Sequence, residues 1–270
     1  MQQQSITPAF GSLVEDVPVA RLGPPGFRRL HELWQQRHLL VLRGQAIDGA
    51  AFEDFVAGFG EVEAMEAPPW SRAGWGAEQS WIERPPFACA LHARPGMPEG
   101  SSTWFACLPA ALRLMAPELA ARLRWLALHH GPNVHPLVIV QPESGEPTLY
   151  LGARGDTRMP GVPPAESERI LNIVWSYATS PAVTLCHAWR PGDLVLWNNL
   201  TVAHRHEFAD GLRGLRGLRV KGRYTLSAPI RKEADPVANV PEGNALNHRP
   251  AGPWPHWNGA ATPASKLYNL

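Results

Sequence analysis

Apolar residues recur along this chain with helical spacing in some segments and as short unbroken runs in others. In PPGFRRLHELWQQRH (24–38), Phe27, Leu30 and Trp34 follow two prolines at helical spacing, which predicts an amphipathic helix. GAAFEDFVAGFG (49–60) repeats the pattern and ends on a glycine, a common helix terminator. Both segments are therefore expected to pack one apolar face against a core.

The remaining pattern predicts more strands than helices. Further helices are expected over 108–130, restarted by Pro117, and over 163–180, with proline in its first turn. Short apolar runs predict strands over 38–45, 85–93, 136–141, 148–152, 182–189, 193–199 and 217–229. The turn PESGEP joins two of these strands into a predicted hairpin. The segment 64–76 and the tail from Pro236 onward are expected to be loop and coil.

The order of these elements indicates the architecture. Strands are spread along the whole chain, whereas helices are grouped near the N-terminus or inserted between strands. A doubly wound fold needs strict alternation of strand and helix, which is absent. We therefore expect a mainly β fold with flanking helices, a sandwich or jelly roll. The 270 residues, 44% of them hydrophobic, suffice for one sizeable core, and a single domain over 1–270 is expected.

Charge and cysteine usage exclude several kinds of partner. The net charge is +1 and basic residues are scattered, so no nucleic-acid partner is expected. The three cysteines are far apart in sequence, as in proteins of a reducing compartment. The N-terminus has no basic and apolar leader, and no run approaches the roughly 18 apolar residues of a membrane span. A cytoplasmic protein without a membrane partner is expected.

Polar residues cluster after the strand predicted at 193–199. Asn198 and Asn199 end this strand, and His204 and His206 follow two residues apart. In an extended segment such a pair shares one face, and polar groups at the end of a buried strand are well placed to line a pocket. The spacing is equally compatible with two surface histidines or two hydrogen-bonded core histidines.

Two arginines follow in GLRVKGRYTLSA. Arg219 and Arg223 are four residues apart, and a strand would place them on the same face. If that face is buried, each guanidinium requires an anion, and a carboxylate is the natural bidentate partner. An ordinary exposed strand face remains the alternative.

The order and spacing of several segments resemble the taurine dioxygenase family of iron(II)/2-oxoglutarate oxygenases. The segments are FGSLVEDV, RHLLVLRGQAID, FVAGFGEVE, IERPPFACALHARPGMPEGSSTWFACLPAAL, HPLVIVQPESGEPTLYLG and GDLVLWNNLTVAHRHEF. The resemblance implies a double-stranded β-helix, or jelly roll, whose mouth holds Fe(II) on two histidines and a carboxylate. It further implies oxidation of a small anionic metabolite with 2-oxoglutarate and O2. Members are often dimers, so a homodimer is also implied.

The resemblance assigns roles to individual residues. His204 falls on the distal metal-binding histidine, and Thr103 falls on the threonine that contacts the cosubstrate near the metal. Arg219 falls on the arginine that clamps the far carboxylate of 2-oxoglutarate. Arg223 falls where taurine dioxygenase binds the sulfonate of its substrate.

The first two metal ligands are expected in an H-x-D or H-x-E pair just after a tryptophan. In this chain that pair falls on Gly76 to Glu78, behind Trp75. The carboxylate is therefore present as Glu78, but glycine replaces the histidine. No histidine occurs between His38 and His92, so shifting the alignment within the loop does not restore the ligand.

Three hypotheses follow from the missing histidine. In the first, Glu78 and His204 hold the metal with water, substrate or a histidine from elsewhere, for which His92 and His206 are the candidates. In the second, the chain is an iron-independent enzyme that uses Glu78 as acid and His204 as base for proton transfer, elimination or isomerisation. In the third, it is a non-catalytic relative that binds a ligand or a partner. The first is preferred because the other expected positions are kept.

Overall fold

The computed structural model describes residues 1–65, 74–94, 97, 100–207 and 214–226. Its α-helices are α1 (Pro24–Arg37), α2 (Gly49–Ala57), α3 (Leu108–Leu114), α4 (Pro117–Leu123) and α5 (Pro164–Ala178), and its 3-10 helices are η1 (Val19–Arg21) and η2 (Arg154–Asp156). Its strands are β1 (Gln2–Ser5), β2 (Ser12–Glu15), β3 (Leu39–Leu42), β4 (Val62–Ala64), β5 (Ala88–Ala93), β6 (Ser102–Cys107), β7 (Ala127–His130), β8 (Asn133–Pro136), β9 (Val138–Val140), β10 (Pro147–Leu149), β11 (Thr157–Arg158), β12 (Thr184–Ala188), β13 (Leu194–Asn198), β14 (Val202–Glu207) and β15 (Leu215–Val220).

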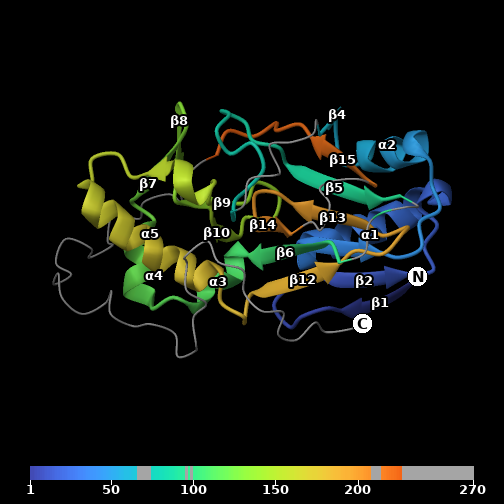
Figure 1. Cartoon of the computed structure of the whole chain (residues 1–270), viewed down its shortest axis with the longest axis horizontal. Coiled ribbons are helices and arrows are strands. Elements are labelled where there is room, and N and C mark those ends of the chain that lie inside the picture. Colours follow the sequence, from blue (N-terminus) through green and yellow to red (C-terminus); the bar gives the residue numbers. More distant parts are fainter. Residues whose placement is uncertain (66–73, 95–96, 98–99, 208–213, 227–270) are drawn as a thin grey trace.

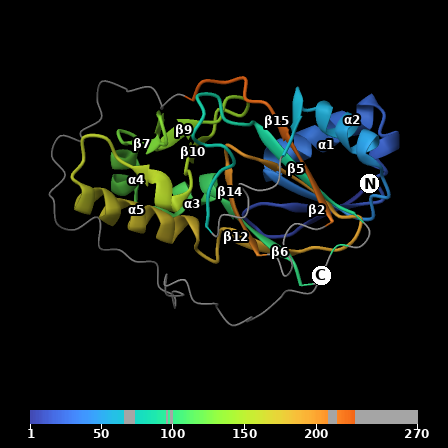
Figure 2. The same ribbon diagram turned by 45° about the horizontal axis from the view of Figure 1, so that its top comes forward.

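Strands far apart in sequence form the main sheet. Its order in the described residues is β1-β2-β3-β13-β5-β15-β4, with β2 parallel to β3 and the other neighbours antiparallel. A second sheet has the order β12-β6-β14, and β9 with β10 and β11-β7-β8 form two smaller sheets. The main sheet and the β12-β6-β14 sheet form the barrel-like body in Figures 1 and 2.

The main sheet is apolar on both faces, which explains its unbroken hydrophobic runs. Along β3, Leu39 and Val41 belong to one buried cluster, and Leu40 and Leu42 belong to the other. The first cluster also contains residues of the β12-β6-β14 sheet, so that face is the interior between the two sheets. Helices α1 and α2 cover the other face with Leu30, Leu33, Trp34, Phe52, Phe55 and Val56.

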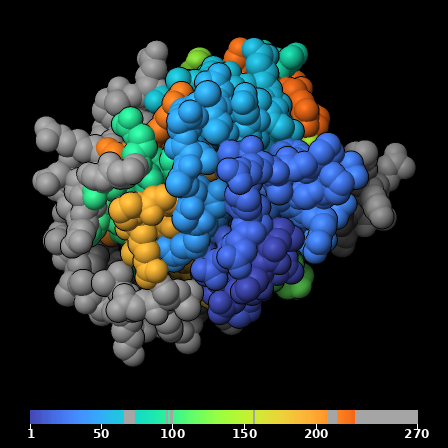
Figure 3. All heavy atoms as spheres, turned by 90° about the vertical axis from the view of Figure 1, so that its right-hand side faces the viewer, coloured from blue at the N-terminus to red at the C-terminus, as the bar shows by residue number. Residues whose placement is uncertain are grey.

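The two groups of helices lie at opposite ends of the molecule. In Figure 1, α1 and α2 flank the main sheet, whereas α3, α4 and α5 lie together beyond the ends of β6 and β14. Seen from the side of α1 and α2, N-terminal residues form a continuous surface over the body (Figure 3). No helix of the described residues is long and apolar enough to cross a membrane.

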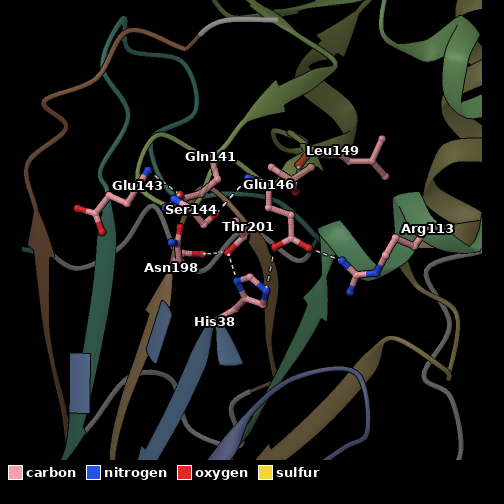
Figure 4. Close-up of polar contacts among 10 residues, drawn as sticks. His38, Arg113, Gln141, Glu143, Ser144, Glu146, Leu149, Asn198 and Thr201 are labelled. Carbon is pink, nitrogen blue, oxygen red and sulfur yellow. Dashed lines mark hydrogen bonds and ion pairs between the residues drawn. The ribbon is translucent and has the colours of Figure 1, made fainter. Parts of the chain in front are cut away.

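The hairpin of β9 and β10 contacts the rest of the fold through the buried side chain of His38. His38 ends α1 in a left-handed conformation (φ 61°), and its Nε2 lies 3.5 Å from the Glu146 carboxylate at the hairpin turn. Arg113 of α3 pairs with the same carboxylate, and the Thr201 hydroxyl lies 3.3 Å from His38 Nδ1 (Figure 4). These contacts fix the hairpin, and therefore the segment after β10 that reaches the candidate site.

The predicted helices at the N-terminus and at 163–180 and the predicted hairpin are confirmed. The helix expected over 108–130 is wrong in its last third: α4 ends at Leu123, and Ala127–His130 is β7 because it pairs with β8 and β11. The strand expected over 217–229 is too long, since β15 ends at Val220 opposite the start of both partner strands, at Val62 and Ala88. The coil from Pro236 onward lies outside the described residues, and the single domain over 1–270 stays a prediction.

Candidate active site

The segment that carries Gly76 pairs with β14 directly opposite His204. The Gly76 N–H donates to the His204 carbonyl oxygen at 3.1 Å, and the His204 N–H donates to the Gly76 carbonyl oxygen at 3.0 Å. A Cβ added to Gly76 would lie only 2.9 Å from the Ala153 nitrogen and 3.1 Å from the Gly152 carbonyl carbon. Main chain therefore fills the space in which a side chain at position 76 would begin.

Asn199, directly after β13, holds the neighbouring turn at Glu78. Its Oδ1 accepts from the Glu78 N–H at 2.8 Å, and its Nδ2 donates to the Glu78 and Pro86 carbonyl oxygens at 2.9 and 3.0 Å. The asparagine is completely buried. All three bonds involve main chain of the 78–86 segment, so Asn199 sets where Glu78 lies without contacting its carboxylate.

The Glu78 carboxylate instead contacts Arg219 of β15. Arg219 Nη1 donates to Glu78 Oε1 at 3.2 Å, and Arg219 Nε donates to Glu63 Oε1 at 3.1 Å. The Glu78 and Arg219 side chains are 6% and 8% exposed, whereas Glu63 is 36% exposed, so only the first pair is removed from water. Burial raises the pKa of Glu78 above its ordinary value, and the attraction of Arg219 offsets part of that rise.

Thr103 of β6 contacts two aromatic side chains, Trp189 directly after β12 and His206 of β14. It is fully buried, accepts from the Trp189 indole N–H at 2.9 Å, and lies 2.9 Å from His206 Nδ1. Thr103 and His206 are direct cross-strand neighbours in the pairing of β6 with β14, which explains the contact.

His204 is a buried imidazole whose Nδ1 has no hydrogen-bond partner in the described part of the chain. Its ring centroid lies 5.1 Å from Trp197 of the main sheet and 4.9 Å from His206. Burial lowers the pKa of His204 to about 4, so the ring is neutral at physiological pH. The expectation that His204 and His206 share a face of an extended segment is confirmed.

The two sheets turn these groups toward the same interior. Arg219 pairs with Cys89 across β15 and β5, and Cys89 belongs to the cluster between the sheets. His204 contacts Trp197 of that cluster. The structure thus brings Glu78 into contact with Arg219, and Thr103 into contact with His206. The main-chain hydrogen bonds between Gly76 and His204 connect the segment that carries Glu78 to β14.

Two predicted residues lie elsewhere. Arg223 is beyond the end of β15, and its half-exposed side chain pairs with Glu143 at 2.7 Å and lies over the Phe87 ring at 5.4 Å. His92 lies 3.0 Å from the Gln45 carbonyl oxygen and contacts Phe52 of α2, so it lies on the helix-covered face of β5. Arg223 and Arg219 therefore do not share a strand face, and His92 does not reach His204.

A family model described as "Taurine catabolism dioxygenase TauD, TfdA family" matches residues 2–219. The chain belongs to this family. The (S)-phenoxypropionate/alpha-ketoglutarate-dioxygenase of Sphingobium herbicidovorans is 27% identical over 246 residues, covering 73% of this chain and 85% of the relative. The alpha-ketoglutarate-dependent 2,4-dichlorophenoxyacetate dioxygenase of a Burkholderia species is 24% identical over 289 residues, covering 85% of this chain and 97% of the relative.

Solved structures agree on the fold of this TauD/TfdA family member. A taurine dioxygenase from Burkholderia xenovorans superposes with a TM-score of 0.74 at 25% identity, covering 84% of this chain and 93% of that protein. The structure of AAD-2 with Mn(II) and N-oxalylglycine superposes with a TM-score of 0.77 at 21% identity, covering 84% of this chain and 100% of the other, and shows likeness of fold. The predicted jelly roll is therefore confirmed.

TauD/TfdA proteins are 2-oxoglutarate-dependent oxygenases that use Fe(II), and this chain is an enzyme of that class. The side chains present do not fit a three-ligand iron site. His204 offers one neutral nitrogen, and the candidate His206 lies beside it at 4.9 Å between ring centroids with its Nδ1 at the Thr103 hydroxyl. Ala153, however, fills the space beside Gly76, and Glu78 is bound to Arg219. No group of three or more His, Cys, Asp or Glu side chains is placed to hold a metal anywhere in the described ranges.

Sequence reasoning missed the residues that fix these groups in place. The sequence marks Asn199 as a polar residue at the end of a strand, but its position does not reveal that its side chain binds the main chain of Glu78. Glu63 sits among alternating residues of a short strand and carries no signal that it reaches Arg219. The close approach of Ala153 to Gly76 joins segments over seventy residues apart, which no local pattern predicts.

Proposed function

We propose that this TauD/TfdA protein oxidises a small organic acid with 2-oxoglutarate and O2, at a metal site that differs from the family's three-ligand site. The observation that carries the proposal is the inward-facing Arg219, a buried guanidinium in the interior between the two sheets. A buried guanidinium requires an anionic partner, and its planar fork matches a carboxylate. The names of the relatives agree with this substrate class, since phenoxypropionate and 2,4-dichlorophenoxyacetate are carboxylates.

In this proposal each side chain has a defined task. Arg219 binds the far carboxylate of 2-oxoglutarate, and Thr103 orients the near end. A bound metal would take a neutral imidazole nitrogen from His204, and Glu78 would be the carboxylate available to it. Arg223, which is half exposed and paired with Glu143 away from this interior, is given no contact with the substrate. No step of the reaction is assigned to iron, because the described side chains do not complete its ligand set.

A second candidate function is favoured by the Glu78–Arg219 pair itself. If Glu78 stays on Arg219, the chain keeps a buried acid with a raised pKa and a neutral imidazole in one interior. Such a pair suits iron-independent proton transfer, elimination or isomerisation. A relative that binds an organic anion without catalysis would keep the same contacts.

The deciding experiment measures metal content, metal binding and succinate release on one preparation. Calorimetry with Fe(II) under anaerobic conditions, followed by succinate assays against a panel of aryloxy and alkyl carboxylic acids, is expected to give metal binding and acid-dependent succinate. Metal binding without succinate would exclude these acids as substrates. No metal binding and no succinate would contradict the oxygenase and favour the second candidate.

Arg219→Ala tests the anion site, and Arg216→Ala is a matched control. Arg216 lies on the same strand but is 40% exposed and pairs with Glu53 of α2. Loss of a bidentate charged pair is expected to weaken 2-oxoglutarate binding about 100-fold in Arg219→Ala, roughly 3 kcal/mol. Arg216→Ala is expected to bind as the unaltered protein does, and equal losses in both variants would remove the role assigned to Arg219.

The homodimer and the cytoplasmic location remain proposals of the same kind. The cysteines Cys89, Cys107 and Cys186 are free thiols, and the first two are buried. Free buried thiols suit a reducing compartment. Sedimentation equilibrium of the purified protein tests the dimer directly, because a monomeric mass at micromolar concentration contradicts it.

A further inference from the structure

The chain's own acceptors surround the Arg219 guanidinium. Besides Glu63 at Nε and Glu78 at Nη1, the Ala64 carbonyl oxygen accepts from Nη2 at 3.4 Å. With the Gln79 amide turned so that its oxygen faces the guanidinium, that oxygen accepts from Nη1 at 2.7 Å and from Nη2 at 3.0 Å. In that orientation, five contacts reach the three nitrogens of the guanidinium, which has five N–H groups in total. An incoming carboxylate therefore has to replace a contact that already exists.

Glu78 is the contact that an incoming carboxylate resembles. Its oxygen and Arg219 Nη1 are both withdrawn from water, so each relieves the burial cost of the other. Glu63 contacts a different nitrogen and is 36% exposed, so water and salt screen it. The Ala64 and Gln79 acceptors are uncharged. Among the four, only Glu78 combines negative charge with burial.

The attachment of Glu78 lets its side chain move without its main chain. The Asn199 side chain forms hydrogen bonds with the Glu78 N–H and carbonyl oxygen. The following residue, Gln79, has a left-handed conformation (φ 46°) that fixes the turn. Within the described part of the chain, Arg219 is the only residue that holds the Glu78 carboxylate. Rotation about the side-chain bonds of Glu78 would release Arg219 while the turn stays in place.

We propose that Glu78 is a built-in carboxylate ligand of Arg219, which a carboxylate from outside must displace before it binds. The inference rests on the proposed function, because it takes Arg219 as the anion receptor. Two ligands that share one receptor compete, and the apparent affinity of the outer ligand falls in proportion to the fraction of receptor left open. Glu78 thus holds the site closed when no organic acid is present, and it supplies no metal ligand in that state.

Calorimetry of 2-oxoglutarate binding to chelator-treated protein tests the competition. Glu78→Gln keeps the size of the side chain and removes the competing charge, whereas Glu63→Gln makes the same change at the screened contact. If Arg219 is open in a tenth of molecules or fewer, Glu78→Gln is expected to bind 2-oxoglutarate about 10-fold tighter or more. Glu63→Gln is expected to change the affinity by less than about 3-fold. Equal affinity in Glu78→Gln and the unaltered protein would overturn the inference.

Small carboxylates provide a second measurement that does not depend on 2-oxoglutarate. Glu78→Ala leaves a gap beside Arg219, so acetate or propionate is expected to raise the melting temperature of this variant beyond the effect of chloride at equal ionic strength. The unaltered protein and Glu63→Ala are expected to respond equally to both salts. If acetate stabilises the unaltered protein as much as Glu78→Ala, Glu78 does not occupy the anion site.

The outcomes separate this inference from the proposed function. Tighter 2-oxoglutarate binding in Glu78→Gln, together with no succinate release by the unaltered protein, would support the built-in ligand and contradict the oxygenase. Loss of binding in Arg219→Ala with unchanged binding in Glu78→Gln would keep the anion site and overturn the built-in ligand. Unchanged binding in both variants would overturn both.

Discussion

Gly76 faces His204 across a two-residue antiparallel bridge, and the main chain at Ala153 closes the space beside it. The segment after β10 therefore occupies the place where the family resemblance expects a histidine side chain. Gly76→Ala is expected to lower the free energy of unfolding by about 1–3 kcal/mol, because its Cβ must push main chain aside. Urea denaturation measures the effect.

A matched variant separates crowding from loss of a glycine. A Cβ on Gly74, two residues earlier, would meet no atom of the described residues within 4 Å. Gly74→Ala is therefore expected to leave stability within about 0.5 kcal/mol of the unaltered protein. Equal destabilisation at both positions would show that the loop, not the contact with Ala153, limits substitution.

Gly76→His tests the absent ligand directly. The sequence alone leads one to expect that this change strengthens metal binding, since it restores the expected motif. The structure predicts destabilisation instead, with no gain in metal affinity by calorimetry, because Ala153 blocks the path of the imidazole. A gain of metal affinity in a folded variant would show that the segment at 152–153 moves aside.

Asn199 is predicted to be a major stabilising residue of the site. Asn199→Ala removes three buried hydrogen bonds and leaves the Glu78 N–H and two carbonyl oxygens without that partner. The expected loss is roughly 3 kcal/mol or more in the free energy of unfolding. Asn198→Ala, which removes one bond to the Leu200 N–H, is the control, with an expected loss of about 1 kcal/mol. Similar losses of unfolding free energy in both variants would contradict the stabilising role of Asn199.

The sequence predicts the parts of the fold that depend on local pattern. The apolar runs around Leu40 and Leu196 are strands because both of their faces are buried, and the helix at 24–37 shows its apolar stripe directly. The prediction of a helix over 108–130 is wrong at its end because the structure there depends on pairing with distant strands. Residues 127–130 are apolar enough for a helix, and only their pairing with β8 and β11 makes them a strand.

The candidate site is predictable as residue types but not as partnerships. The family resemblance selects Glu78, Thr103, His204 and Arg219, and the structure directs all four toward one interior. The contact between Glu78 and Arg219 depends on the length of the glutamate side chain and on the hydrogen bonds from Asn199 that position its main chain. A sequence motif predicts neither of them. The placement of Arg223 depends on where β15 ends, and Val220 ends it because the partner strands begin there.

Thr103 is predicted to act through its hydroxyl group. Thr103→Val keeps the shape of the side chain but removes the oxygen that contacts the Trp189 N–H and His206 Nδ1. The expected loss is about 1–3 kcal/mol in the free energy of unfolding. Thr103→Ser keeps the hydroxyl and is expected to lose less. A serine variant as unstable as the valine variant would show that the methyl group, through packing, is what matters.

His130 of β7 is predicted to make the protein less stable in acid. Its ring is buried and stacks on Tyr150 at 5.4 Å, and neither of its nitrogens has a hydrogen-bond partner in the described residues. Burial, aided by His135 and His129, lowers the pKa of His130 from 6.5 to about 3. Between these two values the unfolded chain binds a proton that the folded chain does not, so stability falls as the pH falls through this window.

Urea denaturation from pH 7 to pH 4 measures the free energy of unfolding. Comparing His130→Gln with the unaltered protein isolates the contribution of His130 to its pH dependence. Below pH 6.5 the unaltered protein is expected to lose up to about 1.4 kcal/mol more per pH unit than the variant, the slope of one proton. His129→Gln removes a less buried imidazole from the same strand, which makes only a minor contribution to the low pKa of His130, so this variant is expected to keep most of the slope. Other buried groups titrate equally in both proteins, so they do not contribute to the difference between the slopes. Identical slopes would mean that His130 is protonated as readily in the folded state as in the unfolded chain. Burial of His130 would then have no electrostatic consequence.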